Sequence, residues 1–101
     1  MVEQVVILPG AEHDIDEAYD WYEQRHPGLG NGFLRCVDAC IFSIQRNPEL
    51  HAFAFENYRR ALVRRFPYAV FYEYSQQTET VVIYSVFHCS QDPSKWRRRL
   101  P

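Results

Sequence analysis

The apolar residues of this chain change their spacing at Pro48, and the change divides the sequence into a helical part and a strand-rich part. Before Pro48, two segments repeat apolar residues three and four positions apart, which is typical of amphipathic helices. After it, three segments rich in Val, Ile, Tyr and Phe are separated by turn residues, which is typical of strands. Because the two kinds of element occupy separate stretches, the sequence predicts an α+β fold.

The helical part is predicted to form an antiparallel hairpin with a short joint at residues 28–32. The first helix ends at His26, since Pro27 disfavours helical geometry in the residue before it. The second begins with Asn31 or Gly32 as its cap and ends before Pro48. The two apolar faces consist of Ala11, Ile15, Ala18, Tyr19 and Tyr22, and of Phe33, Val37, Cys40, Ile41 and Ile44. The carboxylates of the first helix are expected on its outer face: Glu12, Asp14, Asp16, Glu17, Asp20 and Glu23.

The strand-rich part is predicted to form a meander. Strands are expected at residues 58–66, 68–74 and 80–88, and the short connections between them make these strands antiparallel. Another strand is expected at residues 5–8, ahead of the helices. Asp92 and Pro93 are typical of a helix start and predict a short C-terminal helix over residues 94–99. We therefore expect one domain, residues 1–101, with the hairpin packed on one face of an antiparallel sheet.

The composition favours a folded cytoplasmic protein. Hydrophobic residues make up 47% of the chain, yet no apolar run approaches the roughly 20 residues that a membrane span requires. The start of the chain lacks the cationic and apolar segments of an export signal. The three cysteines are odd in number and include no C-x-x-C pair, so we expect reduced thiols.

Charge is divided between the two parts of the chain. Residues 1–58 hold ten carboxylates and three arginines, a balance of −7, whereas residues 59–101 hold eight cations and three carboxylates, a balance of +5. A basic, strand-rich surface predicts an anionic partner, either nucleic acid or an acidic polypeptide.

Four arginines lie within the first predicted strand of the meander. Alternation would place Arg60 and Arg64 on one side of the strand, and Arg59 and Arg65 on the other. One interpretation is an edge strand protected by charge against unwanted pairing. The other is a cationic stripe that binds phosphates or an acidic partner segment.

Two further groups are candidates for a partner surface. His88 ends the last strand, on the side expected for Val82, Tyr84 and Val86, and is either a hydrogen-bonded structural histidine or a polar group of the surface. The basic tail that follows is either a frayed solvated end or a docking surface: Lys95, Trp96, Arg97 and Arg98.

Other chemistry lacks a complete set of residues. The candidate metal ligands, such as Cys36 with Cys40 or the adjacent His88 and Cys89, do not complete a site, so neither a metal nor a cofactor is expected. The glycines at residues 28–32 join two helices instead of following a strand, which argues against a phosphate-binding loop. No nucleophile motif is present.

Three segments together resemble the RelE/ParE superfamily of small toxins from type II toxin-antitoxin modules. They are residues 18–22 (AYDWY), residues 64–72 (RRFPYAVFY), and residues 86–88 (VFH) followed by residues 92–96 (DPSKW). The resemblance spans nearly the whole chain and implies the same strand, helix and meander order. It also implies a cognate antitoxin that forms a hetero-oligomer with the toxin.

The superfamily has two branches, and the sequence favours one of them. The RelE-like branch cleaves mRNA on the ribosome and uses an arginine after the tyrosine that opens the third strand, and another after the last strand. Ala69 and Gln91 occupy these places here, so the resemblance implies a ParE-like toxin that binds DNA gyrase and has no catalytic residues. A RelE-like nuclease and a remnant that binds only its antitoxin are the alternatives. In each case we expect an acidic-to-amphipathic antitoxin segment to cross the strand that bears Arg60 and Arg64.

Overall fold

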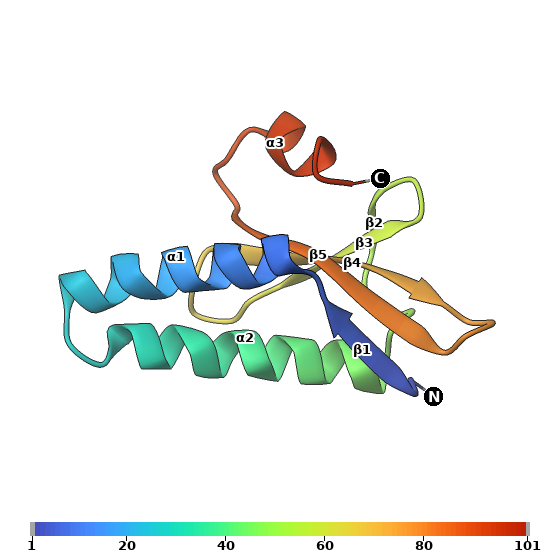
Figure 1. Cartoon of the computed structure of the whole chain (residues 1–101), viewed down its shortest axis with the longest axis horizontal. Helices are drawn as coiled ribbons and strands as arrows, with labels where there is room; N and C mark the ends of the chain where they lie inside the picture. The colour runs from blue at the N-terminus through green and yellow to red at the C-terminus, as the bar shows by residue number, and fades with distance from the viewer. Residues whose placement is uncertain (1, 101) are drawn as a thin grey trace.

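The computed structural model describes residues 2–100 of the chain, apart from the side chain of Trp96. Its elements are β1 (Gln4–Ile7), α1 (Pro9–Arg25), α2 (Leu29–Arg46), β2 (Phe53–Phe55), β3 (Tyr58–Leu62), β4 (Tyr68–Ser75), β5 (Thr80–His88) and α3 (Pro93–Arg97). The strands form one sheet in the order β1-β5-β4-β3-β2, and α3 lies across this sheet from α2 (Figure 1). The predicted α+β class, helical hairpin, meander and short C-terminal helix are confirmed. Among the described residues, no helix has the length and hydropathy for a bilayer crossing.

The sheet is mixed rather than purely antiparallel. The β3-β4-β5 meander is antiparallel as predicted, but β1 pairs with β5 in parallel, with Val5 opposite Val81. Parallel pairing needs a long crossover between the two strands, and the hairpin with the first strands of the meander supplies it. The sheet also contains β2, which the sequence did not predict, because three residues are too few to reveal an alternating pattern.

The first strand of the meander is shorter than predicted. β3 ends at Leu62 instead of residue 66, and residues 63–67 form the turn into β4. Arg65 has φ 71°, in the left-handed region, so regular strand geometry cannot continue through it. Arg64 and Arg65 therefore lie in the β3–β4 turn, and the prediction that one strand carries all four arginines is wrong.

The joint of the hairpin is tighter than predicted. α2 begins at Leu29, so only residues 26–28 separate the two helices. Gly28 adopts φ 90°, which favours glycine, and stands just before α2. The Glu23 carboxylate accepts hydrogen bonds from the backbone N–H groups of Gly28 (3.0 Å) and Gly30 (2.9 Å). This acceptor satisfies N–H groups that have no partner within the helix, which moves the start of α2 ahead of Asn31.

The hairpin packs on the sheet through an aromatic cluster. The ring of Tyr22 lies 4.9 Å from that of Phe66 and 5.4 Å from that of Phe33, centroid to centroid, and Phe33 lies 5.0 Å from Tyr68. Beyond this cluster, buried Tyr72 donates a hydrogen bond to the Pro48 carbonyl at 2.7 Å, and burial raises the pKa of Tyr72 to about 12. Most residues of the apolar faces predicted for the two helices are thus buried against the sheet, whereas Ile15, Tyr19 and Ile41 are only partly buried.

A β-bulge changes which side chains face the helices. Phe71 pairs with Ser85 but Tyr72 pairs with Ile83, so Tyr84 is an extra residue on β5. Tyr84 itself contacts Glu73 on the face away from the hairpin, whereas Val86 beyond it is buried in the core under the hairpin. His88 is two residues after Val86 and lies on that same side. The prediction that His88 shares a side with Val82 and Tyr84 is therefore wrong, because the bulge shifts the alternation.

Candidate functional site

The face of the sheet turned away from α1 and α2, called the outer face, carries a small apolar cluster. Ala69 and Phe71 are each 2% exposed and pack with partly buried Leu100 of the C-terminal segment. Arg60 lies on this face, because its register partner is Phe71. Leu62, two residues further along β3, is 62% exposed. An exposed cation and an exposed apolar side chain thus stand next to each other at the margin of the outer face.

The basic residues predicted as site residues occupy three places. Arg60 is exposed on the outer face, and Arg64 and Arg65 are exposed in the β3–β4 turn. Lys95, Arg97 and Arg98 are exposed on or just after α3, and the guanidinium carbon of Arg97 lies 4.9 Å from the ring centroid of Phe55. The C-terminal cations therefore belong to the same outer face as Arg60. The side chain of Trp96, also a predicted site residue, lies outside the described residues.

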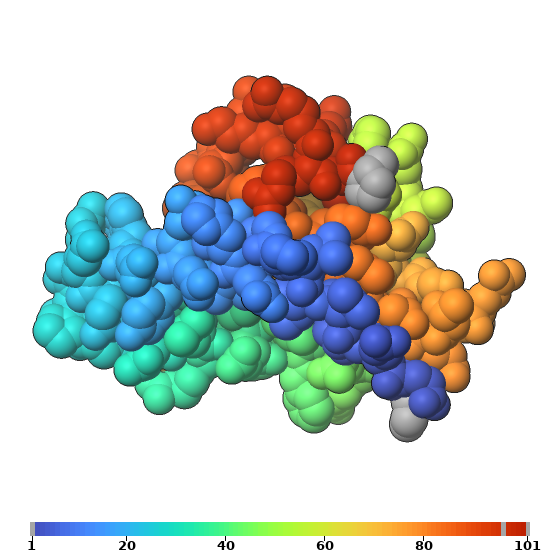
Figure 2. Space-filling view, viewed as in Figure 1, coloured from blue at the N-terminus to red at the C-terminus, as the bar shows by residue number. Residues whose placement is uncertain are grey.

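Asp14 is buried, which corrects the prediction that all carboxylates of the first helix face solvent. It is 7% exposed, and its carboxylate accepts hydrogen bonds from the Arg99 guanidinium at 3.1 and 3.0 Å and from the Val86 backbone N–H at 3.0 Å. The contact holds the C-terminal segment beside the beginning of α1 (Figure 2). A side chain at Gly10 would compete for this space, because a Cβ there would lie 2.6 Å from Arg99 Nη2.

The burial of Asp14 could have been predicted from its spacing in the sequence. Asp14 follows Ala11 by three residues and precedes Ala18 by four, and these spacings place it on the apolar face of α1. Arg99 gave no such signal, since its partner is 85 positions away in the sequence. The ion pair is consequently a feature that only the packed structure reveals.

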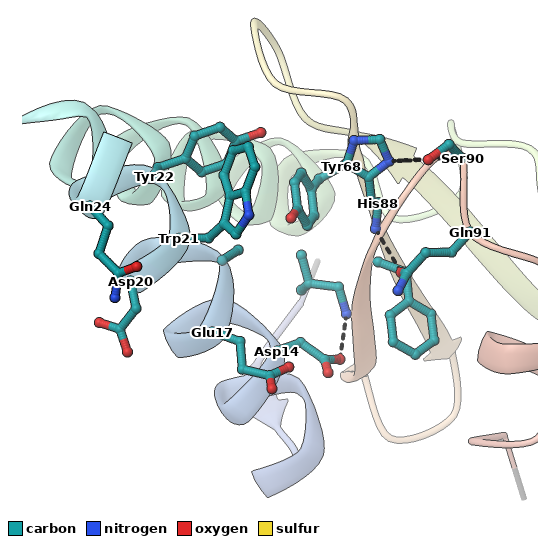
Figure 3. Close-up of a pocket in the computed structure, with 13 residues that line it drawn as sticks. Asp14, Glu17, Asp20, Trp21, Tyr22, Gln24, Tyr68, His88, Ser90 and Gln91 are labelled. Carbon is teal, nitrogen blue, oxygen red and sulfur yellow. Dashed lines mark hydrogen bonds between the residues drawn. The ribbon is translucent and has the colours of Figure 1, made fainter. Parts of the chain in front are cut away.

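A groove of about 700 Å³ lies between α1 and the end of β5, and is called the α1–β5 groove. Its lining includes three carboxylates of α1 and five aromatic or imidazole rings: Asp14, Glu17, Asp20, Trp21, Tyr22, Tyr68, Phe87 and His88. Tyr68 stands between α1 and His88, with its ring 6.1 Å from Tyr22 and 5.2 Å from His88, centroid to centroid (Figure 3). The groove exists because the bulge turns Val86 and His88 toward α1.

His88 is held by the turn that follows it. Its Nδ1 accepts a hydrogen bond from the backbone N–H of Ser90 at 3.1 Å and lies 2.7 Å from the Ser90 hydroxyl oxygen. The backbone N–H of His88 donates to Oε1 of Gln91 at 3.1 Å. The hydrogen-bonded structural role expected for His88 is thus present. Its contribution to a partner surface stays a prediction.

The electrostatics of the groove are acidic. Glu17 and Asp20 are exposed on α1, and the described residues that line the groove include neither lysine nor arginine. The pKa of Tyr68 is raised by burial and, to a smaller extent, by neighbouring Tyr22 and by the negative charge of Glu17. Such a lining favours a cationic ligand and disfavours a phosphate.

The three cysteines are free thiols that differ in burial. Cys40 is buried, donates a hydrogen bond to the Leu62 carbonyl, and has its pKa raised to about 11 by burial. Cys36 is partly buried and Cys89 is exposed. Within the part of the chain that the structure describes, no three His, Cys, Asp or Glu side chains gather in a way that could hold a metal ion.

The family model of the ParE toxin of type II toxin-antitoxin systems (parDE) matches residues 5–93. The chain belongs to this family. The recognition made from the sequence, and the toxin role that it implies, are therefore confirmed at the level of the family. Curated proteins gave no match to the sequence.

Two solved structures share the fold of this ParE-family chain. One is the chromosomal ParDE toxin-antitoxin system from P. aeruginosa, with a TM-score of 0.74, 15% sequence identity, and coverage of 87% of this chain and 96% of that one. The other is the toxin-antitoxin complex RelBE2 from Mycobacterium tuberculosis, with a TM-score of 0.60, 20% identity, and coverage of 87% and 99%. Both toxin-antitoxin structures are thus similar to it in fold.

Proposed function

We propose that this ParE-family toxin acts by binding DNA gyrase and not by cleaving RNA, and that a cognate antitoxin neutralises it. The observation that carries the proposal is Ala69, which stands where RelE-like nucleases resemble one another in having an arginine. It is 2% exposed and lies among apolar side chains of the outer face, next to Phe71 and Leu100. A buried methyl group at this position cannot stabilise the charge that develops on a phosphate.

The second RelE-like arginine position supports the same proposal. Gln91 occupies it, and its side-chain oxygen accepts a hydrogen bond from the His88 backbone, so the residue shapes the turn after β5. RNA cleavage without a metal needs a base for the 2′-hydroxyl, cations for the phosphorane and an acid for the leaving oxygen. On the outer face, Arg60 lies opposite Phe71 and the Arg97 guanidinium lies over Phe55, but Ala69 and Gln91 add no charge to these cations.

The proposed antitoxin contact is the outer face near β3. Arg60 and Leu62 are exposed there, and the basic α3 lies on the same face. An acidic, amphipathic segment that folds on the toxin would match this mixture of charge and apolar surface. The proposed complex is a hetero-oligomer of toxin and antitoxin in the cytoplasm.

The test is plasmid supercoiling by purified gyrase in the presence of the antitoxin-free toxin. We expect loss of supercoiling or accumulation of cleaved DNA, and reversal of either effect when antitoxin is added. Unaffected gyrase would contradict the proposal, provided that circular dichroism shows the toxin to be folded. Cleaved transcripts on translating ribosomes would then indicate the nuclease, and normal growth without antitoxin would indicate an inert antitoxin binder.

A further inference from the structure

We propose that the α1–β5 groove is a docking site for an arginine side chain carried by a cationic segment of the antitoxin. The partner's identity rests on the proposed function, whereas the chemistry rests on the groove itself. This contact would be separate from the outer-face contact, because the groove lies on the side of the sheet that carries α1.

The charges of the groove select a cation. Asp20 is exposed and forms no ion pair among the described residues, and Glu17 is joined only to exposed His13 at 3.4 Å. Asp14 closes the groove toward the C-terminal segment. A nucleic-acid strand would bring its phosphates against these carboxylates, so the lining argues against RNA or DNA as the occupant.

Two residues that line the groove each already contact an arginine of the chain itself. Arg99 binds Asp14 through two hydrogen bonds, with nitrogen–oxygen distances of 3.1 and 3.0 Å. The guanidinium carbon of Arg25 lies 3.9 Å from the ring centroid of Trp21, in a cation–π contact. Glu17 and Asp20 lie between these two residues in the sequence of α1 and share the groove lining with them. They present the same kind of acceptor without an arginine of their own.

The floor of the groove suits the rest of an arginine side chain. The partly buried ring of Tyr68 provides apolar surface for its methylene groups, and Trp21, which is 49% exposed, provides a ring at the rim. A volume of about 700 Å³ leaves room for a neighbouring apolar side chain of the same segment. The geometry thus favours an arginine next to an apolar residue over an isolated cation.

The first experiment uses two pentapeptides with blocked termini that differ only in the charge of the central side chain. One is Ala-Leu-Arg-Leu-Ala, and the other carries citrulline, the neutral urea analogue of arginine, in place of arginine. Calorimetric titration of the free toxin should show at least about fivefold tighter binding of the arginine peptide. Nuclear magnetic resonance should place the shifts at Trp21 and His88. Equal affinities, or shifts confined to the outer face, would overturn the proposal.

The second experiment uses the complete antitoxin. The double variant Glu17→Gln with Asp20→Asn should weaken antitoxin binding about tenfold, whereas the matched double variant Glu12→Gln with Asp16→Asn, on the same helix but outside the groove, should leave it nearly unchanged. Equal affinities for the two variants would overturn the groove proposal and leave the outer-face contact intact. If the unsubstituted toxin does not bind the antitoxin at all, the proposed function itself fails.

Discussion

Asp14 joins three parts of the chain that are distant in sequence: helix α1, the residue after the bulge of β5, and the C-terminal segment. A buried carboxylate is costly to desolvate unless it is paired and hydrogen-bonded. Here the bidentate Arg99 contact and the Val86 N–H offset that cost. The same contact fixes where the chain runs after α3, and so where the basic outer-face residues Lys95 and Arg97 lie.

Replacement of this carboxylate should destabilise the protein. In Asp14→Ala, the Val86 N–H and the Arg99 guanidinium lose their buried acceptor, and we expect the free energy of unfolding to fall by about 2–4 kcal/mol. Urea denaturation followed by circular dichroism measures this change. Asp16→Ala, an exposed position on the same helix, is the control and should cost less than about 0.5 kcal/mol. Similar midpoints for the two variants would refute a structural role for Asp14.

Among the helices and strands, two local structural features set the geometry of the groove. The bulge at Tyr84 turns the end of β5 toward α1, and the Glu23 carboxylate holds the beginning of α2 close to the end of α1. Neither feature can be predicted from the spacing of hydrophobic residues. A bulge depends on how β4 and β5 pair, and a carboxylate that serves the next helix looks in sequence like any other charge on a solvent-exposed face.

The joint of the hairpin can be tested through Glu23. Glu23→Ala removes the acceptor for two backbone N–H groups at the beginning of α2, where a negative charge is also favourable. We expect a loss of about 1–2 kcal/mol, which lowers the Tm of a domain of this size by roughly 5–10 °C. Gln24→Ala, at an exposed neighbouring position, is the control. A calorimetric Tm equal to that of the control would show that the joint is set by Gly28 alone.

For the whole molecule, the charge division of the sequence becomes a division in space. The groove beside α1 is lined by carboxylates, and the outer face beyond the sheet carries Arg60 with the cations of α3. An antitoxin that contacts both would need segments of opposite charge. The arrangement favours a wrapped complex over a single flat interface.

Antitoxin binding should therefore depend on Arg60. Arg60→Glu is expected to lower the affinity about tenfold and to reduce its decrease with added salt, because one charge contact is lost. Calorimetric titration at low and high salt measures both quantities. Arg35→Glu changes another exposed arginine, on α2, and should leave both nearly unchanged. Full affinity in the Arg60→Glu variant would contradict the outer-face contact, and adding Arg64→Glu tests the contribution of the β3–β4 turn.

Features that depend on residues close to one another in the chain could be predicted from the sequence. The spacing of Ala11, Ala18 and Tyr22 predicted the buried face of α1, and the alternation after Pro48 predicted the meander. Four features became visible only in the packed structure: the parallel pairing of β1, the turn that contains Arg64, the side on which His88 lies, and the Asp14–Arg99 contact. Periodicity reports only which face of an element is apolar. Strand register and ion pairs between distant residues are fixed when those faces pack together.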